Sequence, residues 1–109
     1  MICVATSARI QTMKNVICEA IHQKLQLSFW YDGGQRIVEP HAYGLGTSGN
    51  QLLRAYQVSG FSRSGDVPDW KIFRVDQISG LELLTQSFEQ PRPDYRRNDR
   101  HMRQIYCQI

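Results

Sequence analysis

A change of hydrophobic period near Leu25 constrains the fold of this chain more than any other feature of its sequence. Before that point apolar residues recur every three or four positions, which is the spacing of one helix face. After it apolar and polar residues alternate in short runs separated by glycine-rich segments, as in antiparallel strands. We therefore expect one amphipathic helix over Thr12–Lys24, with Thr12 as its N-cap, and short strands in the rest of the chain.

The first strand signal is the alternation at residues 27–31, and Asp32-Gly33-Gly34 then provides the turn of a hairpin whose second strand runs from Arg36 to Glu39. Further strands are expected at residues 51–58, 70–75, 80–84 and 105–109. The class is thus mainly β (α+β), a small curled barrel with the N-terminal helix packed on it. The predicted core is Ile17, Ala20, Ile21, Leu27, Phe29, Leu53, Phe73 and Val75.

A chain of 109 residues is expected to form a single domain, and 41% hydrophobic with 21% charged residues is typical of an ordered globule. We place the helix and barrel in residues 1–90 and an Arg-rich tail in residues 91–109. The tail ends in the predicted last strand, and it either packs on the same domain or forms a free basic arm. A net charge of +3 permits an anionic partner without requiring one.

The cysteines argue for a reducing compartment. Cys3, Cys18 and Cys107 are odd in number, widely spaced and without a C-x-x-C pair, which argues against both a disulfide scaffold and a zinc site. The apolar run from Ile2 to Ala5 is too short for a signal-peptide core or a membrane span. We therefore expect a cytoplasmic protein that does not enter the membrane and whose stability is indifferent to reductant.

Several motifs together resemble the WYL domain of bacterial and phage regulators, over roughly residues 16–84. The departures are Gln51-Leu52-Leu53 in place of the tripeptide that names the family, and Gln77 in place of a second Arg in the last motif. The matching motifs are Glu19-Ala20-Ile21, Leu27–Tyr31, Arg36-Ile37-Val38-Glu39-Pro40, Leu53-Arg54-Ala55-Tyr56 and Phe73-Arg74-Val75-Asp76-Gln77-Ile78. The resemblance implies an Sm-like or SH3-like barrel that serves as an effector domain in transcription or defence regulation.

Arg36, Arg54 and Arg74 lie on three different predicted strands, and converging guanidinium groups would bind one phosphate or carboxylate. Arg54 and Arg74 each lie between two apolar neighbours, so both side chains should lie on the face opposite the core. The alternative is that each Arg pairs with a local acid, such as Glu39 or Asp76.

The remaining candidate ligand-binding residues are His41, Tyr56 and Gln57. His41 follows Glu39-Pro40 at the expected end of a strand, where it would donate to an anion or else bond to the backbone. Tyr56 shares strand parity with Arg54 and is the best candidate for a stacking or hydroxyl contact, with Gln57 beside it. Trp30 and Trp70 are instead expected to form the core or cover its mouth.

No catalytic pattern is present in the sequence. Ser62 and Ser64 have no G-x-S-x-G context, no phosphate-cradling glycine loop precedes a helix, and the cysteines lack a partner that would activate them. The three histidines share no metal-like spacing. We therefore predict a protein that is not an enzyme and holds no cofactor or metal.

Two classes of function are compatible with these observations. The first is a regulatory, ligand-sensing domain that binds a nucleotide or a single-stranded nucleic acid through an Arg-lined barrel face. The second is a protein–protein interaction module, with a second copy of the chain or a partner regulator docked on the same sheet or on the tail. Binding that depends on phosphate contacts weakens steeply as salt rises, whereas an apolar protein interface responds far less.

Overall fold

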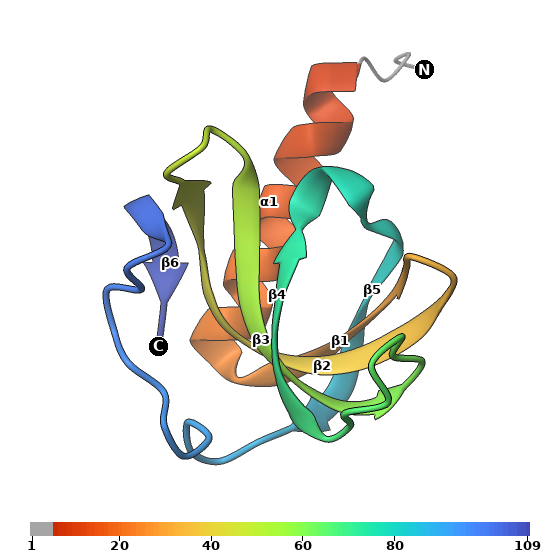
Figure 1. Cartoon of the computed structure of the whole chain (residues 1–109). Coiled ribbons are helices and arrows are strands. Elements are labelled where there is room, and N and C mark those ends of the chain that lie inside the picture. Colours follow the sequence, from red (N-terminus) through yellow and green to blue (C-terminus); the bar gives the residue numbers. More distant parts are fainter. Residues whose placement is uncertain (1–5) are drawn as a thin grey trace.

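The computed structural model describes residues 6–109, with side chains from Thr12 onward. The elements in chain order are α1 (Thr6–Gln23), β1 (Leu25–Tyr31), β2 (Gly34–Gly46), β3 (Gln51–Gly60), β4 (Asp69–Arg74), the short 3₁₀ helix η1 (Val75–Gln77), β5 (Ser79–Ser87) and β6 (Met102–Gln108). The predicted order of one helix followed by strands is confirmed (Figure 1).

The helix begins earlier than its sequence pattern predicted. It starts at Thr6, so Thr12 lies inside it and is not the N-cap. No Gly or Pro interrupts residues 6–23, and nothing in the sequence therefore stops the helix at Thr12. The helix ends at Gln23, and the next residue, Lys24, takes a φ of 54° and donates its N–H to the Ile21 carbonyl oxygen at 3.3 Å.

All strand pairs are antiparallel, in the order β4-β3-β2-β1-β5, with β6 added to the second half of β2. Residues Gly34–Val38 of β2 pair with β1, and residues Ala42–Gly46 pair with β6. Register shifts at Ile37/Val38 and Pro40/Ala42 interrupt the pairing of β2 with β3, and bulges of this kind bend a sheet. The sheet curls (Figure 1) but is not closed, because β4 and β5 remain its two ends within residues 6–109.

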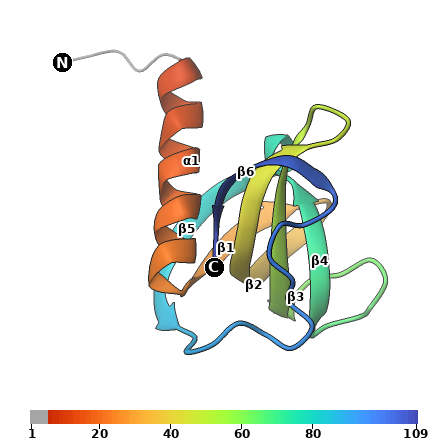
Figure 2. The ribbon, with the colours of Figure 1, turned by 90° about the vertical axis from the view of Figure 1, so that its left-hand side faces the viewer.

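Helix α1 lies across one side of the curled sheet (Figure 2). Ile17, Ala20 and Ile21 on α1 are at most 1% exposed, and all eight residues of the predicted core are buried. Phe73 packs edge-on against Phe29 and Tyr31, with ring centroids 5.0 and 4.9 Å apart. Trp30, which was expected in the core or over its mouth, is instead 53% exposed. No helix in the described part of the chain is long and apolar enough to cross a bilayer.

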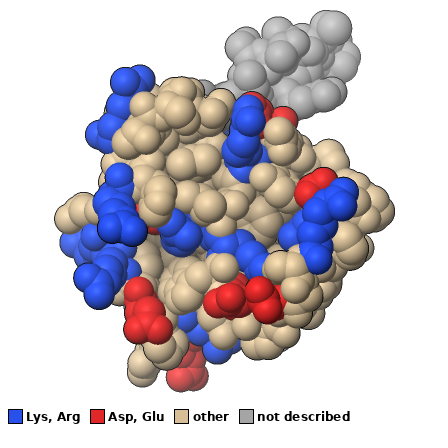
Figure 3. Space-filling view, viewed as in Figure 1, with Lys and Arg blue, Asp and Glu red and all other residues tan. Residues whose placement is uncertain are grey.

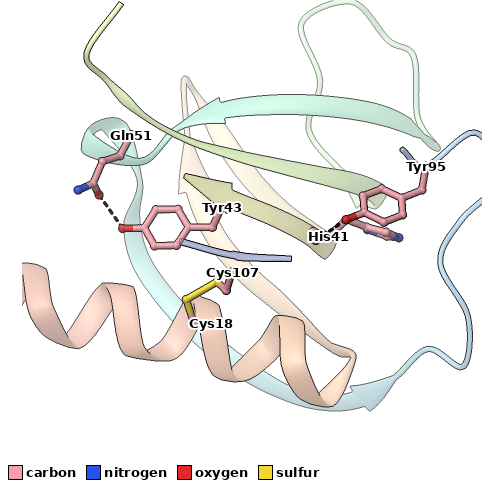
Figure 4. The surroundings of a disulfide bond; sticks show 6 residues. All are labelled: Cys18, His41, Tyr43, Gln51, Tyr95 and Cys107. Atoms are coloured by element: carbon pink, nitrogen blue, oxygen red, sulfur yellow. Dashed lines mark hydrogen bonds between the residues drawn. A yellow bond between two sulfur atoms is a disulfide. The ribbon is translucent and has the colours of Figure 1, made fainter. Parts of the chain in front are cut away.

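Cys18 of α1 and Cys107 of β6 form a disulfide, which corrects the prediction of unpaired cysteines (Figure 4). Their Cα atoms are 5.8 Å apart, although 89 residues separate them in the chain. The sequence spacing could not reveal this pair, because the two cysteines meet only when β6 pairs with β2 beside the helix. Cys3 lies outside the described residues.

The chain between β5 and β6, residues 88–101, runs back across the molecule to reach β2 (Figures 1 and 2). On its way it contacts β3 and β4: the Trp70 indole N–H donates to the Pro93 carbonyl oxygen at 3.0 Å, and Arg54 pairs with Asp99. We call residues 88–101 the tail segment. It packs on the sheet, and β6 follows it directly.

Candidate functional site

The outer face of β3 and β4 carries three facing pairs of side chains. Leu52 lies opposite Arg74, Arg54 opposite Ile72, and Tyr56 opposite Trp70, and facing residues of an antiparallel pair share one face. The residues between them, Leu53, Ala55 and Phe73, are buried on the inner face. Arg54 and Arg74 therefore lie on the same face, away from the core.

The two arginines nevertheless do not converge. Arg74 Nη2 donates to Asp76 Oδ2 at 3.0 Å and to Asn50 Oδ1 at 3.3 Å. Arg54 Nε donates to Asp99 Oδ2 at 2.7 Å, and its Nη2 lies 3.2 Å from His101 Nδ1. Arg74 thus has the local acid that the alternative interpretation named, whereas Arg54 is directed into the tail segment.

A cavity of about 630 Å³ lies between the tail segment and the outer face of β3 and β4. We call it the tail cavity. Arg96 and Arg100, both exposed, have no hydrogen bond or ion pair to any residue that the structure describes. Figure 3 shows Lys and Arg side chains gathered on the side of the molecule where the tail segment and β6 lie. The cavity is lined by Arg54, Trp70, Asp94, Tyr95, Arg96, Arg97, Asn98, Asp99, Arg100 and His101.

Asp99 holds the tail segment over Arg54. Its side chain is only 9% exposed, and besides the Arg54 ion pair it accepts the His101 backbone N–H at 2.9 Å. Burial alone would raise the pKa of Asp99, but the hydrogen bonds from Arg54 and His101 outweigh it and lower the pKa below its ordinary value. Asp99 is therefore a carboxylate that neutralises Arg54, which leaves the other cationic groups of the cavity in excess.

Two aromatic rings stand in the wall of the tail cavity. The rings of Trp70 and Tyr95 are nearly parallel, with an interplanar angle of 21° and centroids 6.2 Å apart. The Tyr95 hydroxyl donates toward the carbonyl oxygens of Ile109 at 3.1 Å and His41 at 3.3 Å. Burial raises the pKa of Tyr95, so its hydroxyl keeps its proton at neutral pH.

His41 lies beneath this wall and is fully buried, so it does not reach the cavity as a ligand-binding residue would. Its Nε2 accepts the Arg92 backbone N–H at 3.1 Å, which requires Nδ1 to carry the proton and to donate to the Glu39 carbonyl oxygen at 2.8 Å. Burial lowers the pKa of His41, consistent with a neutral ring. His41 thus fixes the start of the tail segment. Its carbonyl oxygen also accepts the Tyr95 hydroxyl from the same segment (Figure 4).

Arg92 anchors the tail segment a second time. Its guanidinium donates twice to the Glu39 carboxylate, at 2.6 and 3.0 Å, and lies 4.6 Å from the centroid of the Tyr56 ring. The hydrogen bond to Glu39 raises the pKa of Arg92. Tyr56, predicted as a stacking residue for a ligand, therefore stacks on this internal cation.

Arg36 and Gln57 lie elsewhere, on the inner face of the sheet. Arg36 Nη1 donates to Gln57 Oε1 at 3.3 Å, and the Gln57 amide donates to the carbonyl oxygens of Ser59 and Phe61. Burial lowers the pKa of Arg36, which is only 5% exposed. The predicted site residues therefore separate into four places, and only Arg54 lines the tail cavity.

The sequence interpretation missed Trp70, Tyr95 and the tail arginines as parts of one site. The only available signal was the arginine content of residues 91–103, because the contact of that segment with β3 and β4 depends on tertiary structure. Within residues 6–109 no three His, Cys, Asp or Glu side chains are grouped as metal ligands.

The chain matches no protein-family model, no curated protein and no solved structure at a significant level. The resemblance to WYL domains therefore rests on the motifs quoted above.

Proposed function

We propose that this protein is a non-catalytic binding domain that takes a nucleotide or a short single-stranded nucleic acid in the tail cavity. The observation that carries the proposal is the combination of four arginines and two nearly parallel aromatic rings around one cavity of about 630 Å³. Guanidinium groups bind phosphate through charge-assisted, often bidentate bonds, and bases stack on aromatic rings. The volume lies in the range of typical small-ligand pockets, about 300–1,000 Å³.

Arg96 and Arg100 are the residues that we expect to bind phosphate first. They have no partner among the described residues, so a ligand can engage them without breaking an internal bond. Arg54 is already neutralised by Asp99, and Arg97 Nε already donates to the Ile109 carbonyl oxygen at 3.1 Å. These two therefore shape the cavity, and Arg97 also adds positive potential.

The regulatory role, in transcription or defence, is part of the proposal and is supported by the WYL-like motifs. A cytoplasmic location is also part of the proposal, and it determines the state of the two cysteines. Disulfides are rare in a reducing cytosol, so a cytoplasmic form of the protein would hold Cys18 and Cys107 largely as thiols.

Fluorescence of Trp70 provides the direct test. The chain has two tryptophans, and a Trp30→Phe variant leaves Trp70 as the single indole reporter in the cavity wall. Titration with a nucleoside monophosphate and with an oligothymidylate should change Trp70 emission in a saturable way. Raising the salt concentration should weaken oligonucleotide binding. The logarithm of the binding constant should fall linearly with the logarithm of the salt concentration, with a slope of about −0.7 per phosphate contact.

The matched variants are Arg96→Ala/Arg100→Ala and Arg103→Ala. Arg103 is an exposed arginine of β6 that has no described partner and does not line the cavity, so it controls for the loss of one positive charge, where the double variant loses two. The double variant should bind at least about tenfold more weakly, since one charged hydrogen bond contributes about 1.5–3 kcal/mol. Equal losses in the Arg103 variant, or binding that is indifferent to salt, would favour the protein-interaction module instead.

A further inference from the structure

A second, smaller cavity of about 230 Å³ lies at the inner mouth of the curled sheet, between the β1–β2 turn and the β3–β4 loop. We call it the mouth cavity. Its charged groups are three cations, Arg36, Arg63 and Lys71, and one carboxylate, Asp32. Its lining also includes Tyr31, Ser62, Ser64, Ile72 and Phe73.

Arg36 is a buried cation without a carboxylate partner among the described residues. Its Nε and Nη2 donate to the Tyr31 carbonyl oxygen at 3.2 and 2.9 Å, and its Nη1 donates to Gln57. A guanidinium has five N–H donors, so two of them remain beyond these three bonds. The rings of Tyr31, Phe61 and Phe73 also lie against the guanidinium, with centroids 5.3–5.8 Å away, and they compensate part of its charge. Buried charges in proteins are normally paired with an opposite charge, so an anion from outside the chain would complete this environment.

Lys71 is the second uncompensated cation. Lys71 is on β4 and lies opposite Ala55 of β3. Its side chain is therefore on the other face of the sheet from that of its neighbour Trp70, which lines the tail cavity. Its Nζ donates to Ser62 Oγ at 3.1 Å and to Ser64 Oγ at 3.3 Å, and the two hydroxyl oxygens are 3.0 Å apart. An ammonium and two hydroxyl groups therefore meet at one point, with no carboxylate bonded to the ammonium.

The single acid of the cavity is already occupied. Asp32 accepts two hydrogen bonds from Arg63, Nε to Oδ2 at 2.7 Å and Nη2 to Oδ1 at 3.2 Å. Asp32 also attracts Arg36 electrostatically, but it is one carboxylate among three cations, so the lining keeps an excess of two positive charges. A doubly charged oxyanion is the ligand that matches this excess.

We propose that the mouth cavity binds a phosphate group, as inorganic phosphate or as the terminal group of a phosphomonoester. The Lys71 ammonium and the remaining Arg36 N–H groups supply the charge, and the Ser62 and Ser64 hydroxyls donate to the phosphate oxygens. The volume is below the roughly 300–1,000 Å³ of typical pockets for larger ligands, which suits a tetrahedral oxyanion. The mouth cavity is separate from the tail cavity, so a test of phosphate binding here does not depend on the function proposed for the tail cavity.

Isothermal titration with inorganic phosphate tests the site, at an ionic strength held constant with chloride so that general screening does not change. The wild-type protein should bind one phosphate, and Lys71→Met should weaken the binding about tenfold or more. Ser62→Ala/Ser64→Ala removes hydroxyls from a largely exposed loop and gives the same test if Lys71→Met does not fold. Arg103→Met is the charge control, and it should bind phosphate as the wild type does.

Phenyl phosphate distinguishes the two sources of the group. Binding of phenyl phosphate as strong as that of inorganic phosphate assigns the site to a phosphomonoester, and binding of inorganic phosphate alone assigns it to the free ion. The Arg96→Ala/Arg100→Ala variant should retain phosphate binding in either case. Absence of saturable phosphate binding, or binding that survives Lys71→Met and both serine changes, overturns the proposal and leaves the tail cavity unaffected.

Discussion

Helix α1 and the tail segment both pack on the same sheet, but they are attached by different forces. Ile17, Ala20 and Ile21 attach α1 through apolar contacts that exclude water. The tail segment is attached at His41 and Glu39 of β2 by hydrogen bonds from Arg92, and over β3 by the Arg54–Asp99 ion pair. The Cys18–Cys107 disulfide then ties α1 to β6, the strand that follows the tail segment.

The difference determines how each attachment responds to a perturbation. Apolar burial is non-directional and scales with the area removed from water, so it tolerates small shifts and is insensitive to pH. Buried hydrogen bonds depend on geometry and on protonation, and losing one partner leaves the other unsatisfied. The tail segment, which forms one wall of the proposed binding cavity, is therefore the attachment that a single polar change can release.

The largest effect should come from the apolar core on which α1 packs. Phe73→Ala should lower the free energy of unfolding by about 3–5 kcal/mol, because the ring is 2% exposed and its loss leaves a cavity between Phe29 and Tyr31. Urea unfolding measures the change. An unchanged midpoint would show that Phe73 does not pack in the core cluster that also contains Ile17, Ala20 and Ile21 of α1.

Reduction of the disulfide should have the next largest effect, and it replaces the sequence-based prediction of indifference to reductant. Cys18 and Cys107 close a loop with a sequence separation of 89 residues, and a cross-link of this kind typically contributes about 2–4 kcal/mol. We expect the Cys107→Ser variant to melt at a lower temperature than the oxidised wild type, whether or not reductant is present. The wild type should be destabilised only when reductant is added. Equal melting of the wild type with and without reductant contradicts the pairing.

Loss of the Arg92 side chain should release the tail segment while α1 remains in place. Arg92→Met leaves the Glu39 carboxylate, whose side chain is 3% exposed, without its two hydrogen bonds, at a cost of about 1.5–3 kcal/mol. Hydrogen exchange should accelerate in residues 92–101 and hardly change in α1. The double variant with Glu39→Gln should recover part of the loss, and equal exchange in both regions would remove the distinction between the two attachments.

Acid should act on the tail attachment through His41. Its pKa is lowered by burial in the folded protein, so the unfolded chain binds the proton more readily. The stabilisation is present above the ordinary value of 6.5 and is lost as pH falls below it, because a protonated Nε2 cannot accept the Arg92 N–H. The charged groups near this ring are Glu39 and Arg92. His22→Asn, at an exposed position of α1, should keep this pH dependence of the urea midpoint, whereas His41→Phe should abolish it.

The smallest effect should be that of Arg74, which belongs to neither attachment. Its ion pair with Asp76 joins side chains that are 46% and 58% exposed, and exposed pairs of this kind contribute little. Arg74→Ala should change the free energy of unfolding by less than about 0.5 kcal/mol. It should also leave Trp70 emission on ligand binding unaltered, and a change there would extend the proposed site toward η1.

Strand β2 illustrates what limited the sequence-based prediction of the fold. Only residues 36–39 carried a clear strand signal, yet β2 extends from Gly34 to Gly46. Most of its residues are buried on both faces, because neighbouring strands flank it on both edges and α1 and the tail segment cover it. A strand buried on both faces loses the alternation of apolar and polar residues that makes strands recognisable in a sequence.

The candidate site was predictable only in its residue types. The face on which Arg54 lies was predictable because Arg54 alternates with Leu53 and Ala55, and this alternation is a local property. His41 and Gln57 show no such pattern. Both are fully buried, and their hydrogen bonds to Arg92 and Arg36 join residues 51 and 21 positions apart.

The sequence by itself determined the helix, the strands and the inner face of the sheet, because hydrophobic period and turn residues act over a few neighbouring positions. Apart from the local Arg74–Asp76 pair, tertiary structure alone decided which arginines are neutralised, which remain available, and that Cys18 meets Cys107. These outcomes depend on where the tail segment crosses β3 and β4. That path is set by contacts such as Arg54–Asp99, across 45 residues, whose energies exist only once the sheet has formed.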